Sequence, residues 1–114
     1  MAPEFTATTN EAVYQLGIES ACTIYSRAGL IPGYKGLRAI RSPDRLSRII
    51  VVDESSYVDE DAFNKITQQL PNCKFVWVMD QDQLAPVGSA VPYVTTQEFD
   101  TSELTIIERN KGAL

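Results

Sequence analysis

The sequence predicts an α/β fold, with a mostly parallel sheet and helices on both faces. Two apolar runs, residues 49–52 and 75–79, each end in an acid, and a helical pattern lies between them. A strand, a helix and a second strand in this order require a right-handed crossover, which places the two strands parallel and side by side. With 114 residues, of which 44% are hydrophobic, the chain has room for one small domain with its own core.

The N-terminal third predicts a strand and then a helix. Residues 4–8 have the composition of a short strand, and Asn10 is suited to cap a following helix. Gly17 weakens the end of that helix. Residues 21–26 fit either a helical turn or a strand, because so short a segment has no decisive period. The apolar face of the helix is expected to hold Ala12, Val13 and Leu16.

A basic segment follows. From Arg27 to Arg48 the chain carries six basic residues against one acid, Asp44, although the whole chain has a net charge of −5. Several glycines and prolines interrupt residues 28–47, so we expect a basic, irregular insertion there. Without a global basic field, any contact with nucleic acid must be local.

The second half predicts the centre of the sheet. The β-branched run 49–52 is typical of a parallel strand buried on both faces. Asp59 is placed to cap a helix, with Val58 and Phe63 spaced as a hydrophobic staple. Residues 74–79 predict the second strand, residues 81–92 a loop and residues 103–107 a last strand. The apolar helix face is expected to hold Ala62, Phe63, Ile66 and Leu70.

Composition excludes several kinds of chemistry. The chain has no His, which rules out imidazole-based catalysis and imidazole metal ligands. Cys22 and Cys73 are far apart and lack further partners, so we expect buried free thiols in a reducing compartment. There is no long apolar run and no signal-like start. We therefore expect a cytoplasmic protein without membrane contact.

The strongest chemical signal is a pair of acids after the first central strand. Asp53 is placed to bind Mg²⁺, and Glu54 to polarise an attacking water in phosphoryl transfer. The amide of Gln83, after the second strand, can sense a terminal phosphate. Taken singly, the acid pair also fits a solvated turn, and the segment around Gln83 fits a surface loop. Parallel strands bring both groups to one edge of the sheet.

These residues resemble the motifs of superfamily 1 DNA helicases, nearest the RecD-like and Dda-like enzymes. The similar segments occur in the family's order and span nearly the whole chain. Motif Ia corresponds to residues 7–12, the short threonine motif to 23–26, motif II to 53–56, motif III to 79–88 and motif IV to 104–109. The resemblance implies a partial RecA-like P-loop NTPase fold over residues 1–114, covering helicase motifs Ia to IV.

The resemblance also implies roles for single residues. Asp53 would coordinate Mg²⁺ and Glu54 would activate water, while Gln83 and Arg109 would contact the γ-phosphate of ATP. Arg109 suits this role because its guanidinium is a permanent fork of donors. ATP and Mg²⁺ are the implied cofactors.

Single-stranded DNA is the implied macromolecular partner. By resemblance, Thr9 and Thr23 would contact its phosphates. The basic insertion lies where such helicases carry a small strand-separating or DNA-guiding element, and Arg38 and Arg41 are its candidate contacts. On a simpler reading the threonines are ordinary strand or cap residues, and the insertion is a solvated loop.

One part of the family pattern is missing. The sequence has no G-x-x-x-x-G-K-[ST] loop, the Walker A cradle that binds phosphates. The resemblance therefore implies a fragment of the first RecA-like domain, without the Walker A segment and the second RecA-like domain of the parent chain. In the family the cradle's strand lies between the strands that carry Asp80 and Arg109. We accordingly expect residues 104–107 not to pair with residues 75–79 unless another segment fills the gap.

Three functions remain open from the sequence. The first is a fragment of an ATP-dependent DNA helicase, which couples ATP hydrolysis to translocation on single-stranded DNA and is inactive alone. The second is a non-catalytic nucleic-acid-binding module with a degenerate helicase fold. The third is another nucleotide-handling α/β protein whose acid pair binds a metal, although the segment from Gln83 to Gly88 argues against it.

Overall fold

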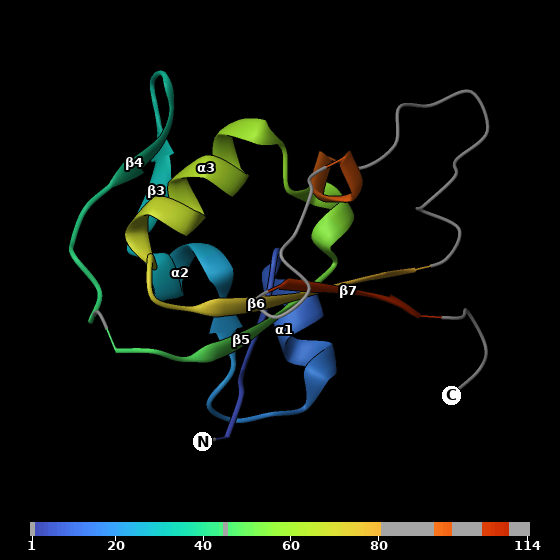
Figure 1. The fold of residues 1–114 in the computed structure, drawn as a ribbon. Coiled ribbons are helices and arrows are strands. Elements are labelled where there is room, and N and C mark those ends of the chain that lie inside the picture. The colour runs from blue at the N-terminus through green and yellow to red at the C-terminus, as the bar shows by residue number, and fades with distance from the viewer. Residues whose placement is uncertain (1, 45, 81–92, 97–103, 110–114) are drawn as a thin grey trace.

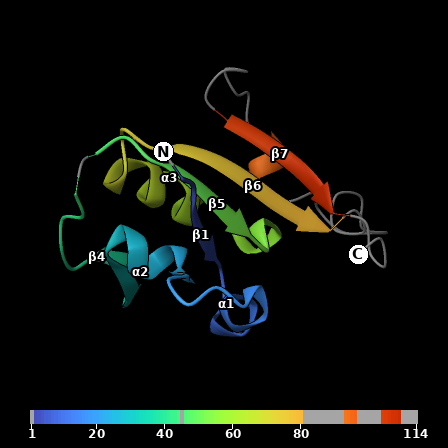
Figure 2. The ribbon, with the colours of Figure 1, turned by 90° about the horizontal axis from the view of Figure 1, so that it is seen from below.

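The computed structural model describes residues 2–44, 46–80, 93–96 and 104–109. Their centre is a sheet with the strand order β2-β1-β5-β6-β7, in which every neighbouring pair is parallel (Figures 1 and 2). The sheet strands are β1 (Glu4–Ala7), β2 (Cys22–Thr23), β5 (Ile49–Asp53), β6 (Lys74–Asp80) and β7 (Leu104–Arg109). The remaining elements are α1 (Asn10–Leu16), α2 (Ile24–Ala28), α3 (Glu60–Gln69), the hairpin strands β3 (Leu30–Gly33) and β4 (Gly36–Ala39), and the 3₁₀ turns η1 (Ser55–Tyr57) and η2 (Tyr93–Thr96).

A threonine caps the N-terminus of each of the first two helices. The hydroxyl of Thr9 accepts a hydrogen bond from the backbone N–H of Ala12, so Thr9 caps α1 and the predicted cap, Asn10, is instead its first residue. Extended backbone at Thr9 explains the difference, because a cap residue lies outside helical φ/ψ space. Thr23 caps α2 in the same way. Residues 21–26 thus hold both predicted alternatives, a two-residue strand followed by a helix.

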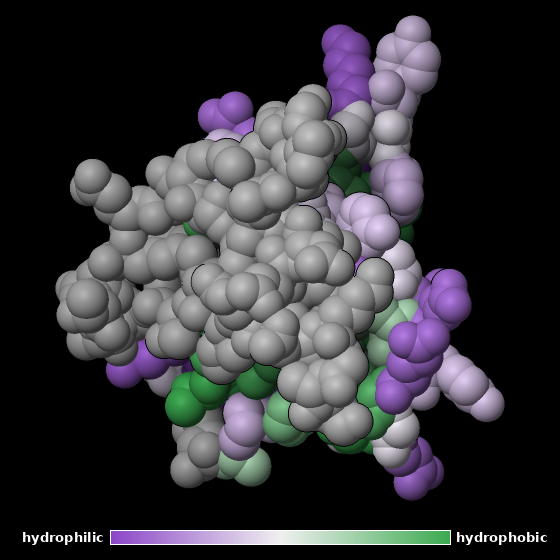
Figure 3. All heavy atoms as spheres, turned by 90° about the vertical axis from the view of Figure 1, so that its right-hand side faces the viewer, coloured by the Kyte–Doolittle hydropathy of each residue, from purple (hydrophilic) through white to green (hydrophobic). Residues whose placement is uncertain are grey.

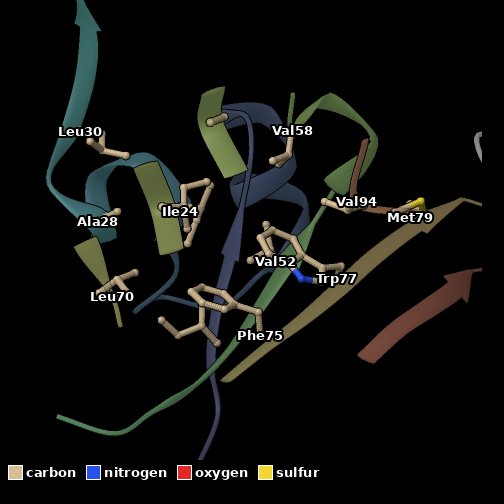
Figure 4. Close-up of a cluster of buried hydrophobic side chains, with 13 residues drawn as sticks. Ile24, Ala28, Leu30, Val52, Val58, Leu70, Phe75, Trp77, Met79 and Val94 are labelled. Carbon is tan, nitrogen blue, oxygen red and sulfur yellow. The ribbon is translucent and has the colours of Figure 1, made fainter. Parts of the chain in front are cut away.

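The core fills one face of the sheet. Helices α2 and α3 cover that face, while α1 packs against β1 and β2 from the other side (Figure 1). Side chains of β5 and β6, among them Val52, Phe75 and Trp77, meet those of α2 and α3 (Figure 4). The predicted strands at β1, β5 and β6 and the two predicted helices are confirmed. On α1, however, only Ala12 of the expected apolar face is buried, and Val13 and Leu16 are partly exposed. The Asp59 cap of α3 is confirmed as well, since its carboxylate accepts the N–H of Ala62 at 2.8 Å.

The opposite face of the sheet is less covered than the sequence predicts. β5 is not buried on both faces, because Ile49 is 38% exposed and Val51 is only partly buried. Phe5 of β1 is 37% exposed on the same sheet. In Figure 3, apolar side chains gather in the lower part of the view. Among the described helices only α1 lies on this side, over β1 and β2, which explains the exposure of the central strands.

The basic segment is only partly irregular, because β3 and β4 form an antiparallel hairpin within it, whereas residues 40–44 and 46–48 belong to no helix or strand. Three polar side chains, one turn apart along α3, hold this hairpin. Asp61 accepts the N–H of Leu37, and the Nζ of Lys65 donates to the carbonyl of Leu37 at 2.5 Å. Gln69 donates to the carbonyl oxygens of Ala28 and Arg41, at either end of the hairpin. These long-range contacts order a segment whose own sequence reads as a loop.

The expected gap in the sheet is absent. β7 pairs in parallel with β6 from Phe75 opposite Leu104 to Asp80 opposite Arg109, so the prediction that these strands remain unpaired is wrong. Without β7, the backbone of β6 would present a row of unpaired N–H and C=O groups along this edge. Pairing with β7 satisfies them.

Both cysteines are free, as predicted, but Cys22 and Cys73 are partly exposed rather than buried. Partial burial raises the pKa of each thiol, which keeps both protonated at neutral pH. In the described part of the chain, no helix is long and apolar enough to cross a membrane.

We predict that Gly36→Ala destabilises the protein by about 1 kcal/mol or more. Gly36 has φ +98°, and a Cβ atom there would lie 2.9 Å from Oδ2 of Asp61, so the change strains the turn and displaces the carboxylate that holds the hairpin. The free energy of unfolding in urea measures the effect. Gly17→Ala is the control, because Gly17 also has a positive φ but open space around it. Equal losses for the two variants would contradict the proposed crowding at Asp61.

Candidate functional site

The first acid lies buried at the carboxyl end of β5. Asp53 is 6% exposed and pairs with Ala7 of β1 across the sheet. Its Oδ1 accepts the N–H of Glu54 at 2.9 Å, and the buried hydroxyl of Ser55 donates to the carbonyl of Val52 at 2.6 Å. These bonds make the turn after β5 rigid and hold the carboxylate of Asp53 at the sheet edge.

The second acid is strained. Glu54 has φ 59° and ψ 40°, a left-handed conformation that costs a non-glycine residue roughly 1–2 kcal/mol. The hydroxyl of Thr8 donates to the carbonyl of Glu54 at 3.0 Å, which helps to hold this conformation. Such strain is concentrated at functional sites in proteins. The two acids also differ in burial, since Asp53 is buried whereas Glu54 is partly exposed.

Glu54 lines a small hollow of about 270 Å³ between α1 and η1, which we name the acid hollow. Thr9, Glu11 and Tyr57 also line it. The structure therefore brings the predicted catalytic carboxylate next to a predicted nucleic-acid contact, Thr9. The sequence did not indicate this juxtaposition, because the two residues are far apart in the chain and meet only through the pairing of β1 with β5.

A larger hollow of about 710 Å³ lies between the starts of α1 and α2 and the hairpin, and we name it the hydroxyl hollow. Thr9, Thr23 and Arg41, three of the four predicted nucleic-acid contacts, line it together with Ser26. Each threonine oxygen accepts a backbone N–H, and its own hydroxyl proton remains available for donation. This hollow combines hydroxyl groups and one cationic side chain, Arg41, with a largely apolar wall.

The fourth predicted contact, Arg38, lies elsewhere. It is exposed on β4 and does not line the hydroxyl hollow. Part of the positive charge of the segment is held inside the fold, because Glu4 binds Arg27 at 2.6 Å and Arg48 at 3.4 Å. The hydrogen bond to Glu4 raises the pKa of Arg27 further. Fewer cations therefore face solvent than the sequence count suggests.

Two candidate residues cannot be placed fully. Gln83 lies outside the described residues, so its expected position beside Asp53 and Glu54 stays a prediction. The backbone of Arg109 ends β7 opposite Asp80, while its side chain falls outside the described part of the chain. Pairing of β5, β6 and β7 nevertheless brings the backbones of Asp53, Asp80 and Arg109 to the same edge of the sheet.

The residues at this edge fit a Mg²⁺ ion. Mg²⁺ is usually held by one or two carboxylates, waters and the phosphates of a nucleotide rather than by a cage of protein ligands. Asp53 supplies a carboxylate oxygen on a rigid turn. Within the described residues no group of three or more acidic or thiol side chains is gathered.

The sequence assigns no role to two tyrosines that line these hollows. Tyr57 is 64% exposed, directly after the acid pair, and Tyr25 is half-buried between the hydroxyl hollow and the start of α3. Burial raises the pKa of Tyr25, and the charge of Asp59 raises it further, so its hydroxyl stays protonated. For Tyr57, the available sequence signal was its aromatic side chain, only three positions after Glu54.

The parallel sheet with an acid pair at its carboxyl edge defines a partial RecA-like P-loop fold. The profile of the AAA domain family matches residues 3–89, most of the chain, and the chain belongs to this family. Membership indicates a nucleotide-dependent, helicase-related function. No curated protein and no solved structure gave a significant match.

We predict that Glu54→Gly makes the protein more stable than Glu54→Gln, by up to about 1 kcal/mol. Both changes remove the carboxylate, but only glycine relieves the left-handed strain at φ 59°. Urea unfolding of the two variants measures the difference. Equal stabilities would show that the turn after β5 stores no strain.

Proposed function

We propose that this chain is part of the first RecA-like domain of a superfamily 1 DNA helicase of the RecD-like type, which couples ATP hydrolysis to translocation on single-stranded DNA. One observation carries the proposal: the acid hollow with Glu54 and the hydroxyl hollow with Thr23 and Arg41 share Thr9. Thr9 thereby links the carboxylate that would respond to the nucleotide with the hydroxyl hollow that would bind the strand.

The proposed roles follow from the chemistry of each group. Asp53 holds Mg²⁺ and Glu54 orients the attacking water, while Gln83 and Arg109 contact the γ-phosphate. Bound Mg²⁺ would neutralise charge on the phosphates of ATP. Because this sequence lacks the phosphate cradle, the cradle and the second RecA-like domain would come from other segments of a parent protein.

The proposed strand contacts use hydroxyl groups and arginines. Thr9 and Thr23 donate to phosphate oxygens within the hydroxyl hollow, and Arg41 lies at the same hollow. Arg38 on the exposed side of the hairpin would follow the backbone further along the strand. Because the two arginines replace counterions on the strand, binding should weaken as salt rises.

A second candidate is a non-catalytic nucleic-acid-binding module with the same fold. The missing G-x-x-x-x-G-K-[ST] loop favours it, because without a cradle the chain has no strong means of holding a triphosphate. In this case the hollows would bind a strand with no response to ATP.

We predict that the chain binds a fluorescein-labelled single-stranded oligonucleotide and that the Arg38→Ala, Arg41→Ala double variant binds it more weakly. Removing two phosphate contacts should lower the slope of log affinity against log salt by about 0.7 for each contact. Fluorescence anisotropy at several salt concentrations measures this. Lys74→Ala is the matched control, because Lys74 is exposed at the start of β6, away from both hollows. No oligonucleotide binding at any salt concentration would refute the proposal.

We predict that the isolated chain shows no DNA-stimulated ATP hydrolysis, because the cradle lysine is absent. Mg²⁺ with ATP should nevertheless shift the backbone amide resonances of Asp53 and Glu54 in NMR spectra, and Asp53→Asn should remove these shifts. Mg²⁺ alone and ATP alone serve as controls. Strand binding without any response at Asp53 would favour the non-catalytic module, and rapid hydrolysis would contradict the role assigned to the missing cradle.

A further inference from the structure

We propose that a third hollow, between the hairpin and the start of α3, binds a nucleobase of the single strand, with Tyr57 as its stacking platform. We name it the base hollow. The inference rests on the proposed function, because it assumes that a nucleic-acid strand lies along the hydroxyl hollow. It adds a base-binding site and the residue that makes it.

The base hollow adjoins both other hollows. It has a volume of about 280 Å³ and shares Tyr25, Pro32 and Leu37 with the hydroxyl hollow. It also shares Tyr57 with the acid hollow. A nucleotide whose phosphate lies in the hydroxyl hollow therefore has an adjoining space for its base, and Tyr57 stands between that space and Glu54.

The hydroxyl hollow and the base hollow carry different charges and therefore suit different parts of a nucleic-acid strand. The hydroxyl hollow offers the donors of Thr9, Thr23 and Arg41, which suit phosphate. The carboxylates of Asp59 and Asp61 line the base hollow, and only Asp61 is paired with a cation, the Nζ of Lys65 at 3.1 Å, among the ion pairs of the described residues, so the charge of Asp59 disfavours phosphate there. Lys65 holds the pKa of Asp61 below its usual value, so this carboxylate stays ionised at neutral pH. An uncharged planar group is the part of a strand that fits there.

Aromatic side chains provide the favourable energy. Tyr57 is 64% exposed, and Tyr25 forms part of the inner wall. Bases stack on aromatic rings with little dependence on their identity, because every base has a π face. An exposed aromatic ring at the edge of a hollow is therefore suited to any base of the strand.

The walls are fixed in advance. Asp61 and Lys65 bind the N–H and the carbonyl of Leu37, which holds the hairpin beside α3. Gly33 and Gly36 also line the hollow, and a Cβ atom at these positions would lie 3.0 Å from the carbonyl oxygen of Gly36 and 2.9 Å from Oδ2 of Asp61, so the hairpin turn is closely packed here. A preformed site loses less entropy on binding than one that must first become ordered.

The test compares Tyr57→Ala with Tyr14→Ala on two strands of equal length. One strand carries all its bases and includes 2-aminopurine, and the other is abasic at every position except a labelled end. Tyr14 is the matched control, because it is 86% exposed on α1 and lines none of the three hollows. Tyr57→Phe keeps the ring and should bind like the original protein.

We expect Tyr57→Ala to weaken binding of the base-containing strand about fivefold or more and to reduce the quenching of 2-aminopurine. Binding of the abasic strand should be the same for Tyr57→Ala, Tyr14→Ala and the original protein. Equal affinity of Tyr57→Ala and the original protein for the base-containing strand would overturn the base site alone. An equal loss on both strands would also overturn it, because the loss would not depend on a base. If neither strand binds the original protein, the proposed function fails and this inference fails with it.

Discussion

The site depends on the pairing of β1 with β5. Ala7 lies opposite Asp53, and the hydroxyls of Thr6 and Thr8 donate to the carbonyl oxygens of Val51 and Glu54. These contacts join residues more than forty positions apart in the chain. They bring the start of α1 against the acid pair, so a shift of one residue in this pairing would separate Thr9 from Glu54.

Helix α3 connects the core with the outer parts of the site. Its apolar face packs against the sheet with Ile66 fully buried, whereas Asp61, Lys65 and Gln69 face the hairpin and bind its backbone. The helix begins shortly after Glu54 and its 3₁₀ turn. Helix α3 thus follows the turn after β5 in the chain and binds the hairpin that lines the hydroxyl and base hollows.

Sequence periods predicted those parts of the fold that local physics determines. The apolar runs of β5 and β6 and the cap at Asp59 needed no tertiary information, because burial and capping act within a few residues. The hairpin was not predictable in this way. Its glycines and prolines favour a loop, and bonds from distant Asp61 and Gln69 determine its order. For the same reason the sequence assigned no role to Tyr25 and Tyr57, because these two residues line one hollow only together with the hairpin.

The pairing of β6 with β7 restricts how a phosphate cradle could join this domain. In the helicase family that the sequence resembles, the cradle's strand lies between these two strands. Here β7 pairs with β6 from Phe75 to Asp80. Neighbouring strands lie only about 4.8 Å apart, so no third strand fits between them without breaking this ladder. A cradle strand placed as in that family would therefore displace β7 from β6, and Arg109 would move with it by one strand position. The position of a phosphate cradle and the pairing of β7 with β6 therefore depend on each other.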